Sequence, residues 1–593
     1  MRALKALAGL PRPVAPADLT GQAMPESKEG QMDSNEHSAA DSDSDEETVH
    51  KDAQVGVQKI EATAQVWTKS TLITVYIMIW FIYFINAMEQ GMTGNLTPYV
   101  TSSFQLHSLT AATSIMSSII GGLFKLPLAK IIDVWGRPQG FLAMTACLTL
   151  GLVMMAACNG VQTYAAAQVL YWLGYNGQGY VMGIVVADTS SLRNRGFMFA
   201  FISSPYIATV WITGPLATAF LNGPGFRWAF GAFAVITPVI SLPLYVLLQW
   251  NYRKAVKAGL MPQHDSGRTV LQSIKYYAIE YDVFGLLLIC GGLALFLLPF
   301  SLYSYQAKGW QSPMIICMIV FGALLLIAFG LWEAYLAPVT FMPWALLRDR
   351  TVLGANILAA VLFFEFYIWN SYFTSFLQVA MGLSITQSSY IANIYSIGSC
   401  FWALVCGALI RWHGKFKAQS LYFGVPITIL GVGLMIHFRQ PDQNIGFIIM
   451  CQILIAFGGG TLVICEQLAA MAATSHQYVA VVLAVEGMFS SVGGAIGSTV
   501  AAAIWTGTFL PNLYKYLPAD EQVNASTIYG DLVTQLSYAK GTAARAGIDR
   551  AYGETQKIMC VAATTALVLA IAGVMMWRDI NVKHNKQVKG LVF

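Results

Sequence analysis

The chain has 593 residues, of which 56% are hydrophobic and only 11% charged, and its mean hydropathy is +0.57. Because an ordinary soluble domain carries about 25% charged residues, this composition excludes a water-soluble enzyme and indicates a membrane protein. The net charge of +4 is spread thinly between apolar runs, and the nine cysteines form no CxxC pair, so nucleic-acid binding, a disulfide framework, a zinc site and an iron–sulfur cluster have no support.

The first 69 residues differ from the rest of the chain, since they are rich in Pro, Ser and acidic residues. The acidic run Asp41–Glu47 is typical of a solvated tail, and we expect residues 1–69 to be disordered. The opening Met1–Leu10 has too short an apolar stretch for a signal peptide. The first membrane span is therefore expected to serve as the targeting signal.

Apolar runs long enough to cross a bilayer, which takes about 20 residues in a helix, recur along the rest of the chain. Fourteen such runs predict an all-α membrane protein with 14 transmembrane helices. They cover residues 71–93, 109–131, 139–158, 162–186, 197–220, 228–249, 282–303, 313–336, 352–378, 388–410, 420–438, 445–468, 478–507 and 558–577.

Basic residues predict how these spans are oriented. The short loops on the side shared with the termini carry fourteen Lys and Arg residues, whereas the opposite loops carry eight, five of them in one long loop. Because Lys and Arg are enriched in cytoplasmic loops, we expect both termini in the cytoplasm, in a multi-pass protein of the plasma membrane or of an endosome. The sequon Asn524-Ala525-Ser526 then lies outside, where Asn524 can accept a glycan.

Two loops repeat one pattern at an offset of 278 residues. The run AKIIDVWGR at 129–137 follows the second span, and GALIRWHGK at 407–415 follows the tenth. In this alignment Gly136 meets Gly414 and Arg137 meets Lys415, which is typical of transporters built from two related halves. The alternative is chance, because turn glycines and basic residues occur in any cytoplasmic loop.

The first of these loops resembles the signature Gly-x-x-x-Asp-x-x-Gly-Arg of the major facilitator superfamily, with Ala129 in place of the first glycine, and Gly214-Pro215 resembles part of a motif of exporters in that superfamily. The resemblance implies two six-helix bundles separated by an inserted helix pair. The implied segments are a first bundle at 70–250, a cytoplasmic linker at 251–281, the inserted pair at 282–337, a second bundle at 351–578 with an outer loop at 508–557, and a cytoplasmic tail at 579–593.

Four longer runs narrow this resemblance, namely PYVTSSF at 98–104, GGLFKLPLAK at 121–130, ADTSSLRNRG at 187–196 and GPGFRW at 223–228. They are similar to runs in the fungal siderophore-iron transporters, in particular carriers of hydroxamate siderophores such as triacetylfusarinine C or ferrichrome-like compounds. The resemblance implies proton-coupled import of a ferric siderophore by alternating access. Such a protein needs no cofactor and no iron ligand of its own, and we expect it to be a monomer.

Ionisable side chains inside a span cost about 3 kcal/mol or more and are usually kept for function. Glu365 lies near the middle of the ninth span and Glu89 in the outer third of the first, at nearly corresponding places in the two halves. Because a desolvated carboxyl group can take a proton from outside and release it inside, both are predicted proton-coupling residues. The alternative is that each is a permanently hydrogen-bonded glutamate that holds two helices together. Glu333, Glu466 and Glu486 lie nearer the cytoplasmic ends of their spans, where snorkelling or pairing is the simpler interpretation.

Lys125 is the only Lys or Arg well inside a span, and it can pair with one of the glutamates or face an anionic substrate; a structural ion pair is the alternative. Aromatic and amide side chains gather at the same level and would suit a bulky, nearly neutral ligand, although packing is the simpler explanation for any single one. Besides Lys125, the predicted substrate-binding residues are Tyr83, Asn86, Tyr175, Asn176, Phe364, Tyr367, Trp369, Asn370 and Tyr372.

The outer loop at 508–557 is longer than a simple connection and is rich in tyrosine. We expect an extracellular lid that helps to capture the substrate, and an inert glycosylated loop is the alternative. On the cytoplasmic side, a clasp is expected to latch the two bundles in the outward-open state. Its predicted gate residues are Asp133, Gly136, Arg137, Asp188, Arg193, Arg195, Arg411 and Lys415.

Two rival functions differ from import in their sequence requirements. A fourteen-helix drug–proton exporter would carry a basic residue in the middle of the fourth span and a glycine-rich continuation after Pro215, and the chain has neither. A non-transporting nutrient sensor would have a larger cytoplasmic signalling segment than the 69-residue tail provides. No GxxxxGK[ST] loop and no HExxH motif supports an enzyme.

Overall fold

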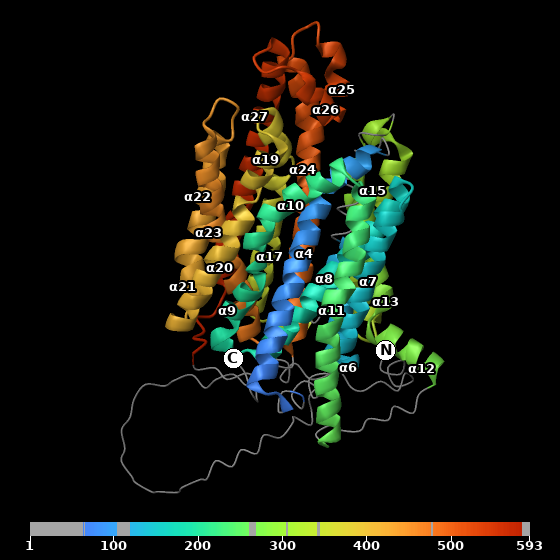
Figure 1. Ribbon diagram of the computed structural model, residues 1–593. Helices are drawn as coiled ribbons and strands as arrows, with labels where there is room; N and C mark the ends of the chain where they lie inside the picture. The colour runs from blue at the N-terminus through green and yellow to red at the C-terminus, as the bar shows by residue number, and fades with distance from the viewer. Residues whose placement is uncertain are drawn as a thin grey trace.

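The computed structural model describes residues 63, 66–103, 119–259, 269–303, 306, 308–340, 344–475 and 478–583. Within these ranges the fold is built from helices and contains no strand, which confirms the predicted all-α class (Figure 1). Most of the predicted tail at 1–69 lies outside the described residues, and the tail at 579–593 is described only as far as residue 583.

The first bundle consists mainly of long apolar helices. In it α7 packs against α8 and α11, and α4 packs against α10 and α11. Its helices are α4 (Lys69–Ser103), α6 (Lys125–Trp135), α7 (Arg137–Ala157), α8 (Val161–Thr189), α9 (Leu192–Ser203), α10 (Pro205–Asn222) and α11 (Phe226–Lys257).

The inserted segment follows α12 (Val270–Glu280), which begins with a capping box formed by Thr269 and Gln272. Two of its helices, α13 and α15, pack on one another, and α14 contacts α24 of the second bundle. The segment consists of α13 (Val283–Leu297), α14 (Pro299–Leu302), η3 (Gly309–Gln311), α15 (Pro313–Leu331) and η4 (Trp332–Leu336).

The second bundle is held together mainly by α17, α23 and α24, which carry most of its buried side chains. Its helices are α16 (Trp344–Leu347), α17 (Arg350–Asn370), α18 (Phe373–Val379), α19 (Ile385–Ala392), α20 (Ile394–His413), α21 (Lys417–Gln419), η5 (Ser420–Gly424), α22 (Val425–Phe438), α23 (Ile445–Ala472), α24 (Val479–Tyr516), η7 (Gln522–Asn524), α25 (Ala525–Gly530), α26 (Leu532–Ser537), α27 (Ala543–Ala566) and α28 (Val568–Met575).

Among the described residues, 11 helices are long and apolar enough to cross a membrane, or up to 12 if the bent pair at Leu271–Glu280 and Val283–Leu297 is one span. The predicted span at 109–131 is described only from residue 119 onward. The predicted span at 162–186 corresponds to α8, a helix of 29 residues that is not among those 11. The count of fourteen spans therefore stays a prediction.

The two faces of the molecule are distinct in Figure 1. We call the face at which α4 begins and α28 ends the terminal face. On the opposite face, α24 and α27 rise above the other helices and carry α25 and α26, so we call it the lid face. With 38 residues α24 is about 57 Å long, which exceeds the roughly 30 Å of a hydrocarbon core.

The predicted lid is smaller than the loop expected at 508–557. Residues up to Tyr516 continue α24, and residues from Ala543 onward belong to α27. The boundaries were wrong because long helices extend beyond the apolar runs that mark a membrane span. The connection between them is the segment 517–542, which we call the lid segment.

The two loops of the sequence repeat have the same backbone role. Gly136 ends α6 with φ 108°, and Gly414 ends α20 with φ 80°. Glycine is favoured at both places because a side chain would be strained at a positive φ. The repeat therefore marks equivalent helix ends on the terminal face.

Candidate transport site

Glu89 is fully buried inside the first bundle. It lies on α4 with 0% of its surface exposed, and the hydroxyl of Thr237 on α11 donates to its Oε2 atom at 2.8 Å. Tyr171 of α8 is its other polar neighbour. The carboxyl group thus joins three helices of one bundle, which is the arrangement of the structural alternative as well as a protected place for a proton.

Asn86, one helical turn before Glu89, belongs to a neighbouring polar network. Its amide donates to Gln178 at 2.8 Å, and the amide of Gln178 donates to Thr145 at 2.8 Å and to Ser241 at 3.1 Å. These partners come from α7, α8 and α11. Since buried polar groups are costly without hydrogen bonds, the network stabilises the interior of the first bundle. In this conformation Asn86 is buried, and its predicted contact with substrate stays a prediction.

Partly buried tyrosines of the first bundle gather on the side that faces the second bundle. The hydroxyls of Tyr175 and Tyr206 are hydrogen-bonded to each other, and Tyr83 donates to the carbonyl of Gly179 at 3.3 Å. Tyr206 also interacts with Cys400 of α20, across the interface. We call Tyr83, Tyr175 and Tyr206 the tyrosine cluster. Tyr206 was not among the predicted site residues. Its signal in the sequence is the preceding Ser204-Pro205, which marks the break at the start of α10.

Asn176 lies beside this cluster on α8. Its amide donates to the carbonyl of Trp172 in the preceding turn at 2.9 Å, and a Cβ atom built on Gly121 would lie 3.1 Å from its Nδ2 atom. Its oxygen is thus left available on a partly buried side chain.

Glu365 is buried in the second bundle, with 3% of its surface exposed. Its nearest polar neighbours are Trp369 one turn later on α17, Tyr395 on α20 and Cys560 on α27. Among the described residues its Oε2 atom has no hydrogen-bond partner. Like Glu89, it lies among helices of a single bundle, so the correspondence of the two carboxyl groups between the halves extends to their surroundings.

Of the other predicted residues on α17, Phe364 and Tyr367 contact α24, whereas Trp369 and Asn370 lie where α17 ends. A Cβ atom built on Gly494 of α24 would lie 2.8 Å from Cε2 of Tyr367, and one on Gly497 would lie 2.3 Å from the carbonyl oxygen of Phe364. The two helices therefore pack closely, with Gly494 against the ring of Tyr367 and Gly497 against the backbone at Phe364. Asn370 is the last residue of α17 and is partly buried.

The break after Asn370 explains the placement of Trp369 and Tyr372. Tyr372 has φ 58° and stacks on Trp505 of α24 with ring centroids 4.0 Å apart. The carbonyl of Trp369, released at the break, accepts a hydrogen bond from Nη1 of Arg439 at 2.6 Å, and the guanidinium lies 4.3 Å from the ring centroid of Phe373. Arg439 was not predicted as a site residue. In the sequence it could be recognised only as a single basic residue in a predicted outer loop.

Lys125, a predicted substrate-binding residue of the first bundle, lies against α24 of the second bundle. It begins α6, and its ammonium group interacts with Glu486 on α24, whose neighbour is Glu466 on α23. The exposed fractions of Glu466 and Glu486 are 0% and 6%, so snorkelling is the wrong interpretation for both. Pairing, the other interpretation, stays a prediction.

The predicted gate residues lie at the terminal face and form two kinds of contact. Inside the first bundle, Arg137 and Asp188 form a buried ion pair at 3.0 Å, and Nη2 of Arg195 donates to the carbonyl of Ser190 at 3.3 Å. Between the bundles, Nε of Arg193 donates to the carbonyl of Arg411 at 3.1 Å.

Three further gate residues contribute through their backbones in this conformation. Lys415 pairs with Asn581, Gly136 shapes the turn before Arg137, and the carbonyl of Arg411 accepts from Arg193. The side chain of Asp133 lies outside the described part of the chain.

The lid segment is fastened to the helix that follows the break in α17. Arg545, with 3% of its surface exposed, donates to the carbonyls of Gln535, Tyr538 and Val379 at 2.8–2.9 Å. At the predicted glycosylation site, Asn524 is exposed and donates to Glu521 at 2.9 Å. Hydrogen bonds from Asn524 and Tyr538 lower the pKa of Glu521, so this carboxylate is a stable acceptor at neutral pH.

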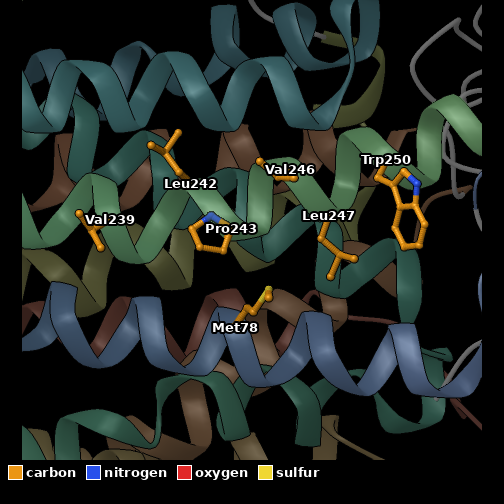
Figure 2. Close-up of a pocket in the computed structure, with 7 residues that line it drawn as sticks. All are labelled: Met78, Val239, Leu242, Pro243, Val246, Leu247 and Trp250. Atoms are coloured by element: carbon orange, nitrogen blue, oxygen red, sulfur yellow. The ribbon is translucent and has the colours of Figure 1, made fainter.

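An apolar hollow on the outside of the first bundle is separate from all these groups. Figure 2 shows its seven lining side chains, which come from α4 and α11 and carry no ionisable group. Val239, Val246 and Trp250 are 61%, 61% and 64% exposed, so this surface faces lipid. The lining residues are Met78, Val239, Leu242, Pro243, Val246, Leu247 and Trp250.

Comparisons with known proteins show what the chain resembles over most of its length. Residues 79–339 and 282–498 match the family model described as the Major Facilitator Superfamily. The chain is 65% identical over 547 residues to the MFS siderochrome iron transporter 1 of Ajellomyces capsulatus, covering 92% of this chain and 93% of that protein. It is 46% identical over 545 residues to the siderochrome iron transporter 2 of Aspergillus fumigatus, covering 92% and 90%. It is 43% identical over 554 residues to the siderophore iron transporter mirB of Emericella nidulans, covering 93% and 92%.

Proposed function

The chain belongs to the major facilitator superfamily, and on that premise we propose that it imports ferric siderophores of the hydroxamate class, coupled to the uptake of protons. The observation that carries the proposal is the 65% identity, over 92% of the chain, to a protein named as a siderochrome iron transporter. Several long sequence runs had already placed the chain near the fungal siderophore-iron transporters, and that resemblance is confirmed.

The chemistry of the interface between the bundles suits such a cargo. A ferric hydroxamate is bulky and nearly neutral, and its iron is already wrapped by the siderophore. The tyrosine cluster of the first bundle offers phenol groups and flat apolar rings. The partly buried rings of Phe364 and Tyr367 are its proposed counterpart on the second bundle. We propose that the cargo binds between these two surfaces, with Asn176 and Asn370 as polar contacts.

Alternating access follows from the two-bundle architecture. In the proposed cycle the lid face is extracellular and the terminal face cytoplasmic, in a monomer of the plasma membrane or an endosomal membrane. The lid segment helps to capture cargo, and the contact of Arg193 with the Arg411 carbonyl closes the cytoplasmic side until cargo and proton are bound, while the ion pair of Arg137 with Asp188 holds the first bundle together at that face.

Glu89 and Glu365 are the proposed proton carriers within the bundles. Both are buried glutamates at corresponding places, and each has a carboxyl oxygen without a hydrogen-bond partner, Oε1 in Glu89 and Oε2 in Glu365. A protonated carboxyl group has a donor to offer at such a place, and an ionised one does not.

Uptake of iron-55 bound to triacetylfusarinine C tests the proposal, in an iron-starved yeast that lacks its own siderophore carriers. We expect saturable accumulation that rises as the external pH falls from about 7 to 5 and is abolished by a protonophore. Ferrichrome labelled in the same way measures breadth within the hydroxamate class. Accumulation no higher than in cells with the empty vector would contradict the proposal and favour the exporter or the sensor.

A further inference from the structure

Lys125 lies flat against the backbone of the opposite bundle. A Cβ atom built on Gly487 would come within 2.7 Å of the Nζ atom of Lys125 and within 2.8 Å of its Cδ atom. Because Gly487 has no side chain, the ammonium group of Lys125 lies against the backbone of α24, where it attracts the carboxyl group of Glu486, the preceding residue. The contact at Gly487 joins α6 of the first bundle to α24 of the second.

Glu486 is one of a pair of buried carboxyl groups. Glu466 of α23 is its neighbour, and neither carboxyl oxygen of Glu466 has a hydrogen-bond partner in the described structure. The other titratable groups that face the pair are Lys125 from α6, Cys465 from α23 and Tyr395 from α20. Lys125 is therefore the cation among the groups around two acids.

Charge balance decides how many protons this site holds. Two adjacent carboxylates repel each other, and a buried charge without a partner costs several kcal/mol. With one proton on the pair, one carboxyl group is neutral, the other is negative and Lys125 is positive, so the net charge is zero. Because the two carboxyl groups interact, the proton belongs to the pair and to neither residue alone.

We propose that Lys125, Glu486 and Glu466 form a proton-operated latch between the two bundles. With one proton on the pair, attraction between Lys125 and the remaining carboxylate holds α6 against α24. A second proton, arriving from the lid face, converts that carboxylate into a carboxylic acid, and the attraction is lost. Lys125 then moves to water as the terminal face opens, the carboxyl group releases its proton there, and the latch can form again.

Two neighbouring contacts between the bundles do not depend on protonation. This supports assigning the response to protons to Lys125 and the two glutamates. The hydroxyl of Tyr180 donates to the carbonyl of Ala480 at 2.5 Å, and Arg193 donates to the carbonyl of Arg411. Both acceptors are backbone carbonyls. The inference rests on the proposed proton-coupled import and adds the place where a proton acts on the interface itself.

Distance measurement by pulsed electron spin resonance tests the latch without cargo. The full-length protein in lipid nanodiscs carries spin labels at Trp135→Cys and Trp412→Cys, which lie on the terminal ends of α6 and α20 and are 48% and 69% exposed, in a Cys317→Ser background. In the parent protein we expect a short distance at pH 8 and a growing population of a longer distance at pH 5.

Two variants remove opposite halves of the latch. A variant with both Glu466→Gln and Glu486→Gln mimics the doubly protonated pair, and Lys125→Met removes the cation, so each should populate the longer distance at both pH values. A variant that combines all three substitutions should resemble either of these, because both remove the same interaction. Glu333→Gln removes another buried glutamate, on η4 of the inserted segment, and should keep the parent response.

The outcomes separate the latch from the proposed function. A parent pH response that is retained both in the variant with Glu466→Gln and Glu486→Gln and in Lys125→Met, with normal elution of the purified proteins, would overturn the latch. If one variant does not fold, the other decides the result. Iron-55 uptake by the parent protein is scored separately, so a protein that opens with acid but accumulates no siderophore keeps the latch and contradicts the proposed cargo.

Discussion

At Arg439, a buried charge supports a break in a helix. The arginine is 0% exposed, its Nη1 atom satisfies the free carbonyl of Trp369, and its guanidinium packs on the rings of Phe373 and Phe376. The break in turn places Tyr372 against Trp505 under the lid segment. One residue thus connects the outer end of α17 to the lid face.

Arg439→Met tests this connection. The substitution leaves the carbonyl of Trp369 buried without a donor and removes the stacking, which should destabilise the protein by about 2 kcal/mol and lower its melting temperature. Arg439→Lys should rescue little, because an ammonium group cannot both stack and reach the carbonyl. The measurement is thermal unfolding of the purified protein followed by tryptophan fluorescence.

Arg227→Ala is the matched control, since this arginine is exposed, its hydrogen bonds to Ala156 and Asn159 are long, at 3.4 Å and 3.5 Å, and its guanidinium lies 5.5 Å from the ring centroid of Phe226. It should change stability by less than about 0.5 kcal/mol. Equal losses in Arg439→Met and Arg227→Ala would mean that Arg439 does not support the break.

Between elements, the close approach of α17 and α24 depends on glycines. Cβ atoms built on Gly493 and Gly497 would lie 2.2 Å and 2.3 Å from the carbonyl oxygens of Ala360 and Phe364. Small residues allow such backbone contact in membrane proteins, where packing replaces the hydrophobic effect as the main source of helix association. The same contact orients Phe364 and Tyr367 of the proposed cargo site.

Gly497→Ala should force α17 and α24 apart. Since the clash is with backbone, it cannot be relieved by a change of rotamer, and overpacking of this kind costs about 1–3 kcal/mol or more. We expect a smaller monodisperse fraction in size-exclusion chromatography and weaker siderophore binding by the part that folds.

Gly507→Ala, on the same helix, is the control, because a Cβ atom there meets nothing within 4 Å. It should be neutral or slightly stabilising, by up to about 1 kcal/mol, through helix propensity. Normal yield and affinity for Gly497→Ala would show that the glycine contact is not needed.

For the whole molecule, import against a gradient requires that proton movement and bundle movement depend on each other. Glu89 and Glu365 lie within single bundles, whereas the latch of Lys125, Glu486 and Glu466 lies between them. We infer that Glu89 and Glu365 set the affinity of each half for a proton. Protonation of the latch then weakens the contact between the bundles.

Glu365→Gln separates binding from coupling. The amide keeps the size of the side chain but cannot carry a proton, so equilibrium binding of the ferric siderophore should survive while pH-driven accumulation falls to the level of exchange across the membrane. Binding is measured on purified protein and accumulation in cells at pH 5 and pH 7, with Glu333→Gln as the control. Undiminished accumulation would remove Glu365 from the coupling role.

Part of this architecture follows from local properties of the chain. The apolar runs locate the helices, because a bilayer of fixed thickness demands about 20 apolar residues in a helix. The two related helix ends at Gly136 and Gly414 could also be predicted from the sequence, since a positive φ at a helix end favours glycine wherever it occurs. The all-α class, the two related loops and the buried state of Glu89 and Glu365 came from such signals.

The tertiary structure decided what each charged side chain faces. Counting along a span gave the depths of Lys125, Glu466 and Glu486, but their contact depends on how α6, α23 and α24 pack, and residues far apart in sequence meet only there. Likewise Arg439 looked like an ordinary loop residue until the break in α17 gave it a carbonyl to satisfy. Depth in the membrane is a property of one helix and is written in its own sequence, whereas partners depend on the rotation of several helices about their axes, which close packing of the assembled bundle fixes.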